Sequence, residues 1–300
     1  MMRHLRGEAH ALRLDIADLV RAAAGPDASR ITVRRAQVGA AGTTTVTCDG
    51  RPLAVGGLDE PFERLRELSY RTGQGTWFTC ELELPAGSRG YVCRTDGEAM
   101  PFAQVDPLGA LGEMTLFPRD EPPGWLVAAL PTAAPLSLPV SALSRPPAPP
   151  AGAVPEWRDH LGECHQPPIT GEVRYTPATG MTARAARLDE GAGPVPGQRF
   201  FYLESRPGDP TAETLLVTAY DDVYCLARHP YGVTDHGVRS LALDGATLRL
   251  ELAAGAADQL QTETVFEVAL DLDAGQAATL RAAVPRVLGQ AAGGPELIGF

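Results

Sequence analysis

The sequence contains no lysine and no asparagine, so its 26 Lys and Arg positions are all arginine. Without lysine, the chain cannot use Schiff-base chemistry, a lysine general base or the lysine of a phosphate-binding P-loop. It also lacks Gly-x-Ser-x-Gly and His-Glu-x-x-His patterns, and the isolated Gly73-Gln74-Gly75 is typical of a turn before a strand. The sequence therefore predicts a protein that is not an enzyme and that acts by binding.

Cysteine is scarce, and long apolar runs are missing. The five cysteines are odd in number, and no pair has Cys-x-x-Cys spacing: Cys48, Cys80, Cys93, Cys164 and Cys225. This pattern indicates reduced thiols rather than a disulfide framework or a zinc ribbon. The most apolar stretch, residues 126–143, is interrupted by three prolines, and the first 20 residues have no apolar run. We expect a soluble cytoplasmic protein without a signal peptide or a membrane partner.

Two groups of soft ligands lie close together in the sequence. They are His160, Cys164 and His165 in one group, and Cys225, His229 and His236 in the other. A zinc site needs four converging ligands, and neither spacing requires convergence. We therefore expect neither a metal nor a cofactor.

The net charge of −11 is unevenly distributed. Residues 1–130 carry 17 acidic side chains against 14 arginines, and residues 131–180 carry 4 against 3. Residues 181–300 carry 16 against 9, a balance of −7. Because phosphate contacts need clustered basic residues, this half is unsuited to nucleic acid. The excess favours a basic protein partner, and a solvated acidic surface that maintains solubility is the alternative.

Hydrophobic periodicity predicts an α+β protein of two small domains, each an antiparallel sheet with covering helices. Residues 1–130 form the first domain. Its helices are expected at 12–23 and from residue 59, its strands at 31–38, 43–48, 76–84 and 91–94, and an irregular tail follows.

Prolines mark the connection between the domains. Residues 131–178 form a proline-rich linker and an ambiguous segment, densest at Pro146-Pro147-Ala148-Pro149-Pro150. For residues 156–180, a linker and an attached sheet edge both remain open. The second domain spans 179–290, with strands at 181–188, 200–204, 214–219, 223–227, 238–243, 248–252 and 266–272. Helices are expected at 253–260 and after Asp273, the last one kinked or shortened by Pro285.

Two patterns in the first half resemble the YezG-like immunity proteins of bacterial polymorphic toxin systems. Gly75-Thr76-Trp77-Phe78 matches a Gly-Thr-Trp strand of that family. Leu116-Phe117-Pro118-Arg119-Asp120, followed by Pro123-Gly124-Trp125-Leu126, matches its late Phe-Pro-Arg element and Pro-x-Trp-Leu. The likeness covers residues 55–128. It departs at residues 101–112, which are largely neutral where the family has an acidic, aromatic stretch.

The second half resembles another family of the same class, the tenth family of immunity proteins. Val223-Tyr224-Cys225 matches its Tyr-Cys strand, and the alternating leucines of 248–252, Ala256-Ala257 and Leu280 follow in order. Asp235-His236-Gly237-Val238 keeps only the final Gly-Val of the family's turn.

These resemblances imply an immunity protein, a cytoplasmic antitoxin that binds a cognate toxin domain and blocks it sterically. The acidic second half would suit a basic toxin such as a nuclease domain. The candidate partner-binding residues are Trp77, Arg119, Trp125, Asp221, Asp222, Tyr224 and Asp235.

Two other functions stay open. An enzyme of unfamiliar type could use Asp221, Asp222, His229 and His236, if these side chains converge in a pocket. A two-module scaffold or adaptor could hold a different partner with each half.

Overall fold

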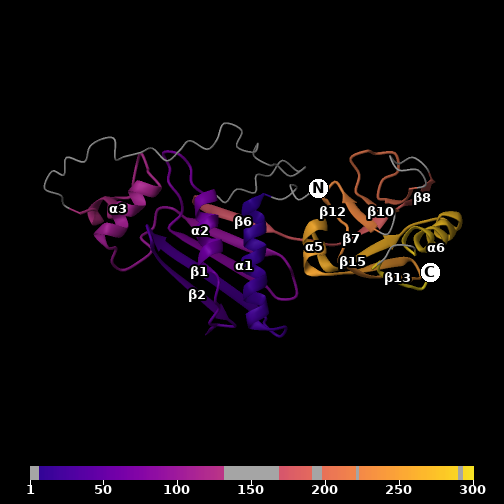
Figure 1. Ribbon diagram of the computed structural model, residues 1–300, viewed down its shortest axis with the longest axis horizontal. Coiled ribbons are helices and arrows are strands. Elements are labelled where there is room, and N and C mark those ends of the chain that lie inside the picture. Colours follow the sequence, from indigo (N-terminus) through magenta and orange to yellow (C-terminus); the bar gives the residue numbers. More distant parts are fainter. Residues whose placement is uncertain (1–6, 132–168, 191–197, 221–222, 290–292) are drawn as a thin grey trace. The chain divides into compact units, whose positions relative to one another are not determined.

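The computed structural model describes residues 7–131, 169–190, 198–220, 223–289 and 293–300. The chain divides into two compact units, Arg3–Tyr175 and Thr176–Phe300. Both units combine helices with β-sheets, so the α+β prediction is confirmed. Figure 1 shows the two units in indigo to magenta and in orange to yellow.

The first unit is built on a six-stranded antiparallel sheet of order β3-β2-β1-β4-β5-β6. Its strands are β1 (Arg30–Val38), β2 (Ala41–Cys48), β3 (Arg51–Pro52), β4 (Thr79–Pro85), β5 (Tyr91–Asp96) and β6 (Gly171–Tyr175). β6 falls in the segment for which the sequence left two interpretations open. It is an attached edge, since Tyr175 pairs with Tyr91 and Gly171 with Thr95.

Two helices cover one face of this sheet, α1 (Glu8–Ala24) and α2 (Asp59–Leu68) (Figure 1). Residues at alternate strand positions point to these helices, including Val33, Leu82 and Leu84, and all three are buried. Ile16, Val20, Phe62 and Leu65 complete the core from the helices. This is the alternation that the sequence pattern predicted.

The irregular tail predicted after β5 is instead a pair of helices, α3 (Pro107–Leu116) and α4 (Gly124–Ala129). Asp106 caps α3 by accepting a hydrogen bond from the Gly109 N–H, and Pro107 occupies the first turn. Ala110 of α3 and Leu126 of α4 form a second, smaller hydrophobic cluster with Val38 of β1 and with Phe78, which precedes β4. The prediction failed because the two glycines within α3 weaken its helical signal.

The sheet face opposite α1 and α2 carries charged side chains across β1, β4, β5 and β6. Arg94 forms ion pairs with Glu83 (3.0 Å) and Glu172 (2.9 Å). Arg30 contacts Glu83 at 3.0 Å, and Arg174 contacts Glu172 at 3.1 Å. These ion pairs link neighbouring strands, and each of these charged side chains has an oppositely charged partner at the surface.

The second unit contains two five-stranded sheets, where the sequence predicted one antiparallel sheet. The first has the order β12-β11-β10-β9-β8 and is antiparallel. The second has the order β16-β13-β14-β15-β7 and is mixed, because β7 pairs with β15 and β16 with β13 in parallel. The first sheet comprises β8 (Ala185–Glu190), β9 (Arg199–Glu204), β10 (Thr214–Tyr220), β11 (Val223–His229) and β12 (Gly232–Thr234). The second comprises β7 (Ala178–Ala183), β13 (Val238–Asp244), β14 (Thr247–Leu252), β15 (Thr262–Leu270) and β16 (Glu296–Ile298).

The predicted strand 181–188 is divided at Arg184, so that β7 and β8 enter different sheets. Two helices, α5 (Ala254–Leu260) and α6 (Ala274–Leu288), join both sheets in one hydrophobic core. α6 packs against β8, β9 and β10 through Leu280 and Val284, and it continues through Pro285 to its end.

Candidate functional site

The β8–β12 sheet has one apolar face in the core and a second face that α6 does not cover. Phe201 and Leu203 of β9 point into the core, as do Leu215 and Val217 of β10. The alternate side chains form what we call the outer face: Arg187, Asp189, Phe200, Tyr202, Glu204, Thr214, Leu216, Thr218, Cys225, Ala227 and His229. Thr218 is buried, and the others are not. The outer face therefore presents aromatic and aliphatic side chains on three adjacent strands.

Tyr202 lies at the centre of the outer face. The strand register places it between Arg187 of β8 and Leu216 of β10. The Arg187 guanidinium lies over the Tyr202 ring, 3.9 Å from its centroid, and its Nε donates to a Glu204 carboxylate oxygen at 2.9 Å. Phe200 stacks on Tyr202 with ring centroids 6.2 Å apart. Partial burial raises the pKa of the Tyr202 hydroxyl, so it remains a neutral hydrogen-bonding group.

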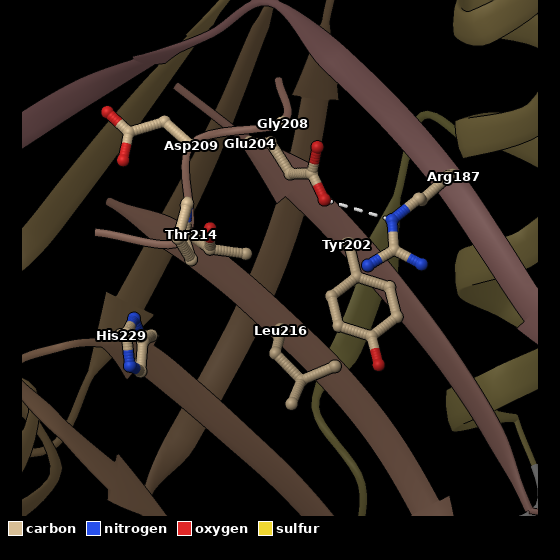
Figure 2. A pocket seen from close by; sticks show the side chains of 9 residues that line it. Arg187, Tyr202, Glu204, Gly208, Asp209, Thr214, Leu216 and His229 are labelled. Carbon is tan, nitrogen blue, oxygen red and sulfur yellow. Dashed lines mark hydrogen bonds and ion pairs between the residues drawn. The ribbon is translucent and has the colours of Figure 1, made fainter. Parts of the chain in front are cut away.

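A pocket of about 410 Å³ opens at the end of this face. It is lined by Arg187, Tyr202, Glu204, Gly208, Asp209, Pro210, Thr214, Leu216 and His229. Figure 2 shows Arg187 reaching toward Glu204 above the Tyr202 ring, with the Asp209 carboxylate turned away from them. Hydrogen bonds from Thr211 lower the pKa of Asp209, which is therefore ionised at neutral pH. The pocket combines apolar walls with two carboxylates and one guanidinium.

Two open sheet faces, one in each unit, differ in chemistry. In the first unit, Arg94 and Glu172 belong to a solvent-exposed ladder of ion pairs, in which each of these charges lies beside an opposite charge. In the second unit, Phe200, Tyr202 and Leu216 occupy comparable positions without being buried. Tyr, Phe and Arg are enriched in protein interfaces, and buried aromatic anchors contribute much of the binding energy there. The outer face is accordingly the best candidate for a protein-binding site among the described residues.

Two residues of the predicted site, Trp77 and Arg119, are structural. Trp77 is 0% exposed, and its indole N–H donates to the Ser69 hydroxyl at 3.0 Å. Arg119 lies over the Phe78 ring, 4.2 Å from its centroid, and donates to the backbone carbonyls of Gly97 and Thr76. Trp77 and Arg119, predicted as partner contacts, are therefore buried side chains whose hydrogen bonds lie inside the unit. The two motifs that carry the first resemblance instead pack against each other inside the unit.

A buried ion pair lies beside these motifs. Arg66 of α2 donates to Glu113 of α3 at 2.6 Å, and both side chains are buried. The same Glu113 oxygen accepts the Gly39 N–H at 2.8 Å, while Arg66 Nε donates to the Trp77 carbonyl. Burial lowers the pKa of Arg66, and the adjacent Glu113 carboxylate opposes that shift. The pair joins α2 and α3 to the turn after β1 and to the segment before β4.

Trp125 and Tyr224 also pack within their own units. Trp125 is half-buried, with its ring 4.7 Å from Phe78 in an edge-to-face contact and its N–H bonded to the Glu98 carbonyl at 2.7 Å. Tyr224 points into the core, and its hydroxyl accepts the Val238 N–H at 3.0 Å. Burial raises the pKa of Tyr224. Tyr224, predicted as a contact residue, is therefore a core residue of its unit, whereas Trp125 remains partly exposed.

The remaining predicted residues do not form one site in the described part of the chain. Asp221 and Asp222 lie outside the described residues. Asp235 is exposed and pairs with His236 at 2.5 Å, and this bond lowers the pKa of Asp235. His229 instead lines the pocket of the outer face. Across the described ranges, no three His, Cys, Asp or Glu side chains are grouped to hold a metal, and no helix is long and apolar enough to cross a membrane.

The sequence reasoning missed the outer face, although a signal for it was present. Phe200-Phe201-Tyr202-Leu203 and Leu215-Leu216-Val217 are apolar at consecutive positions. A strand with one solvated face alternates apolar and polar residues, so these runs indicate strands with both faces apolar. Phe201 and Leu215 fill the core, whereas Tyr202 and Leu216 remain for the outer face.

Comparison of the chain with protein-family models, with curated proteins and with solved structures found no match.

Proposed function

We propose that this chain is an immunity protein, which binds a cognate toxin domain through the outer face of the β8–β12 sheet and blocks it sterically. The supporting observation is the set of accessible apolar side chains on that face, with Tyr202 flanked by Phe200, Leu216 and Arg187. The resemblance of both halves to immunity proteins supplies the class of partner. Steric blocking needs shape and affinity rather than catalytic residues.

The charge of the second unit supports a basic partner. The outer face and its pocket carry the carboxylates of Asp189, Glu204 and Asp209, with Arg187 and Arg206 paired to them. Residues 181–300 as a whole, this face included, carry a balance of −7. A basic toxin surface would be attracted over a distance of about 10 Å at moderate ionic strength, which accelerates encounter.

The experiment has two steps. The tagged full chain first captures its partner from the native host. The captured toxin domain is then co-expressed with the chain or with its variants. The Tyr202→Asp/Leu216→Asp variant places charge on the outer face without altering buried positions. Val265→Asp is its matched control, because Val265 is an exposed apolar residue of β15 in the other sheet of the same unit.

We expect the wild type and Val265→Asp to bind the toxin domain and restore growth, and the double variant to do neither. If the double variant restores growth, the toxin domain contacts a surface other than the outer face. A captured protein that is not toxic would remove the immunity function.

A two-module adaptor is the second candidate, and α3 of the first unit favours it. α3 buries its only charged residue, Glu113, and exposes Leu108 (73%), Leu111 (41%) and Leu116 (56%). Leucines on the solvent side of a helix form a second apolar surface. If each unit captures a different protein by itself, the adaptor function replaces the immunity function.

A further inference from the structure

The core of the first unit contains two cysteines whose sulfur atoms are in contact. Cys80 of β4 and Cys93 of β5 have Sγ atoms 3.6 Å apart. The register pairs Cys80 with Thr95 and Leu82 with Cys93, so the two cysteines are diagonal neighbours on one sheet face. Both side chains are buried in the core that α1 and α2 cover.

The two sulfur atoms are close to bonding distance. A disulfide has an S–S length of about 2.05 Å, so the atoms must approach by about 1.5 Å. β4 and β5 are already paired by the register from Thr79–Asp96 to Glu83–Val92. Diagonal neighbours have Cα atoms about 7–8 Å apart, so closing the bond needs side-chain rotation together with a local shift of β4 against β5.

The surroundings give the two thiols different properties. The hydrogen bond from Cys80 and the adjacent, hydrogen-bonded Arg13 guanidinium lower the pKa of Cys93. The hydrogen bond with Cys93 and burial raise the pKa of Cys80. The Arg13 guanidinium is hydrogen-bonded to Cys93 and acts on Cys80 only through its charge, so its position favours Cys93 as the attacking thiolate and Cys80 as the thiol that resolves the intermediate.

Cys48 and Cys225, the other described cysteines, differ from Cys93 in their burial and in the direction of their pKa shifts. Cys48 and Cys225 are half-buried, and burial is the largest cause that raises the pKa of each thiol. Each is more accessible than Cys93 but is a weaker nucleophile at neutral pH.

We propose that Cys80 and Cys93 form a site of oxidative modification by hydrogen peroxide, which joins β4 to β5 through a disulfide. The Cys93 thiolate attacks one peroxide oxygen, the O–O bond breaks, and Cys93 sulfenic acid and hydroxide form. The Cys80 sulfur then attacks Cys93 Sγ, forming the S–S bond and releasing water, while its proton accompanies the leaving hydroxyl. The proton originally on Cys93 neutralises the hydroxide, so two thiols and one peroxide give one disulfide and two waters.

The burial of the two thiols determines which oxidants can reach them. Peroxide is close to water in size, so it needs only a small local opening of the core to reach the thiols. Glutathione disulfide is much larger, and the buried position of both thiols excludes it from the folded unit. This inference is independent of the proposed function.

The test is peptide mapping of the full chain after treatment with hydrogen peroxide. The oxidised protein is unfolded in excess maleimide and digested with trypsin. Cleavage after Arg71, Arg89 and Arg94 separates Cys80 in Thr72–Arg89 from Cys93 in Gly90–Arg94. We expect these peptides to be linked, with two of the five thiols lost to maleimide, and Cys225 to be labelled.

The controls separate this pair from general oxidation. Cys225→Ser should leave the linked peptides unchanged, whereas Cys80→Ser should leave Cys93 as a sulfenic acid that dimedone traps. Glutathione disulfide should produce no link in the folded chain. Oxidation of Cys48 and Cys225 while Cys80 and Cys93 stay labelled would overturn the proposal, as would a mixture of links among all the cysteines. The wild-type map decides between these results even if a serine variant fails to fold.

Discussion

The Arg187 guanidinium lies 3.9 Å from the centroid of the Tyr202 ring and is hydrogen-bonded to Glu204 at 2.9 Å. This contact holds the Tyr202 ring on the outer face, which is not part of the hydrophobic core. A side chain held in place before binding loses less conformational entropy when a partner covers it. The same three residues line the pocket at the end of the outer face (Figure 2).

Replacing Tyr202 with alanine should weaken partner binding more than it changes stability. Tyr202 is half-exposed, so its loss leaves no internal cavity, but an interface anchor contributes about 2 kcal/mol, or about 30-fold in affinity. Titration calorimetry with the toxin domain measures the change, and Val265→Ala is the control. Unchanged affinity of the Tyr202 variant would exclude the outer face.

The buried pair of Arg66 and Glu113 should dominate the stability of the α3 attachment. Glu113→Ala leaves the Arg66 charge buried and the Gly39 N–H without its acceptor, and should cost about 3–5 kcal/mol. Glu81→Ala removes an exposed partner of Arg94 and should cost about 1 kcal/mol or less. Urea unfolding followed by tryptophan fluorescence measures both. Equal effects in the two variants would contradict the structural role of the pair.

Gly75 should tolerate alanine much less than Gly87. Both glycines have positive φ, +80° and +64°, so a Cβ costs about 1–2 kcal/mol at either position. At Gly75 the Cβ would also lie 2.3 Å from Arg119 Nε, whereas at Gly87 no atom lies within 4 Å. The melting temperature of Gly75→Ala should therefore fall further. Similar melting temperatures would mean that Arg119 moves aside freely.

Asp49 should stabilise the first unit only above acidic pH. The Ser29 hydroxyl and the Arg30 N–H donate to its carboxylate, and these bonds lower its pKa below the ordinary 3.8. A lowered native pKa means that the stabilisation is complete above the unfolded pKa and is lost as pH falls through the native one. The stability difference between wild type and Asp49→Ala should be constant near neutrality and shrink below pH 3.8.

Denaturant titrations at several pH values test this dependence. Ser29→Ala serves as a second variant, because it removes the hydroxyl donor and retains the carboxylate. A difference that grows as the pH falls would contradict the assignment.

Local sequence patterns predicted the elements whose signals are local. The spacing of Phe62 and Leu65 placed α2, and the alternation of Cys80, Leu82 and Leu84 placed β4. The separation of β7 from β8 at Arg184 depends on the pairing of β7 with β15, which lies far along the chain, whereas β8 pairs with the next strand, β9. Such pairing has no local signal, which is why one strand was predicted there.

The candidate site was harder to predict for a similar reason. A tryptophan in a recurring motif suits both a binding anchor and a buried residue, and only packing showed that Trp77 is buried beside Ser69. Tyr202 does not belong to any sequence motif that points to binding. Its place on the outer face depends on the register with Arg187 and Leu216, two residues from other strands.

Photo-crosslinking in the native host tests most directly whether the partner binds the outer face. Full-length chains would carry p-benzoylphenylalanine in place of Tyr202 on the outer face, or of Val265 in the other sheet. The account predicts a crosslink to the toxin domain from position 202 and none from position 265. A crosslink from position 265 alone, with the toxin demonstrably bound, would contradict it.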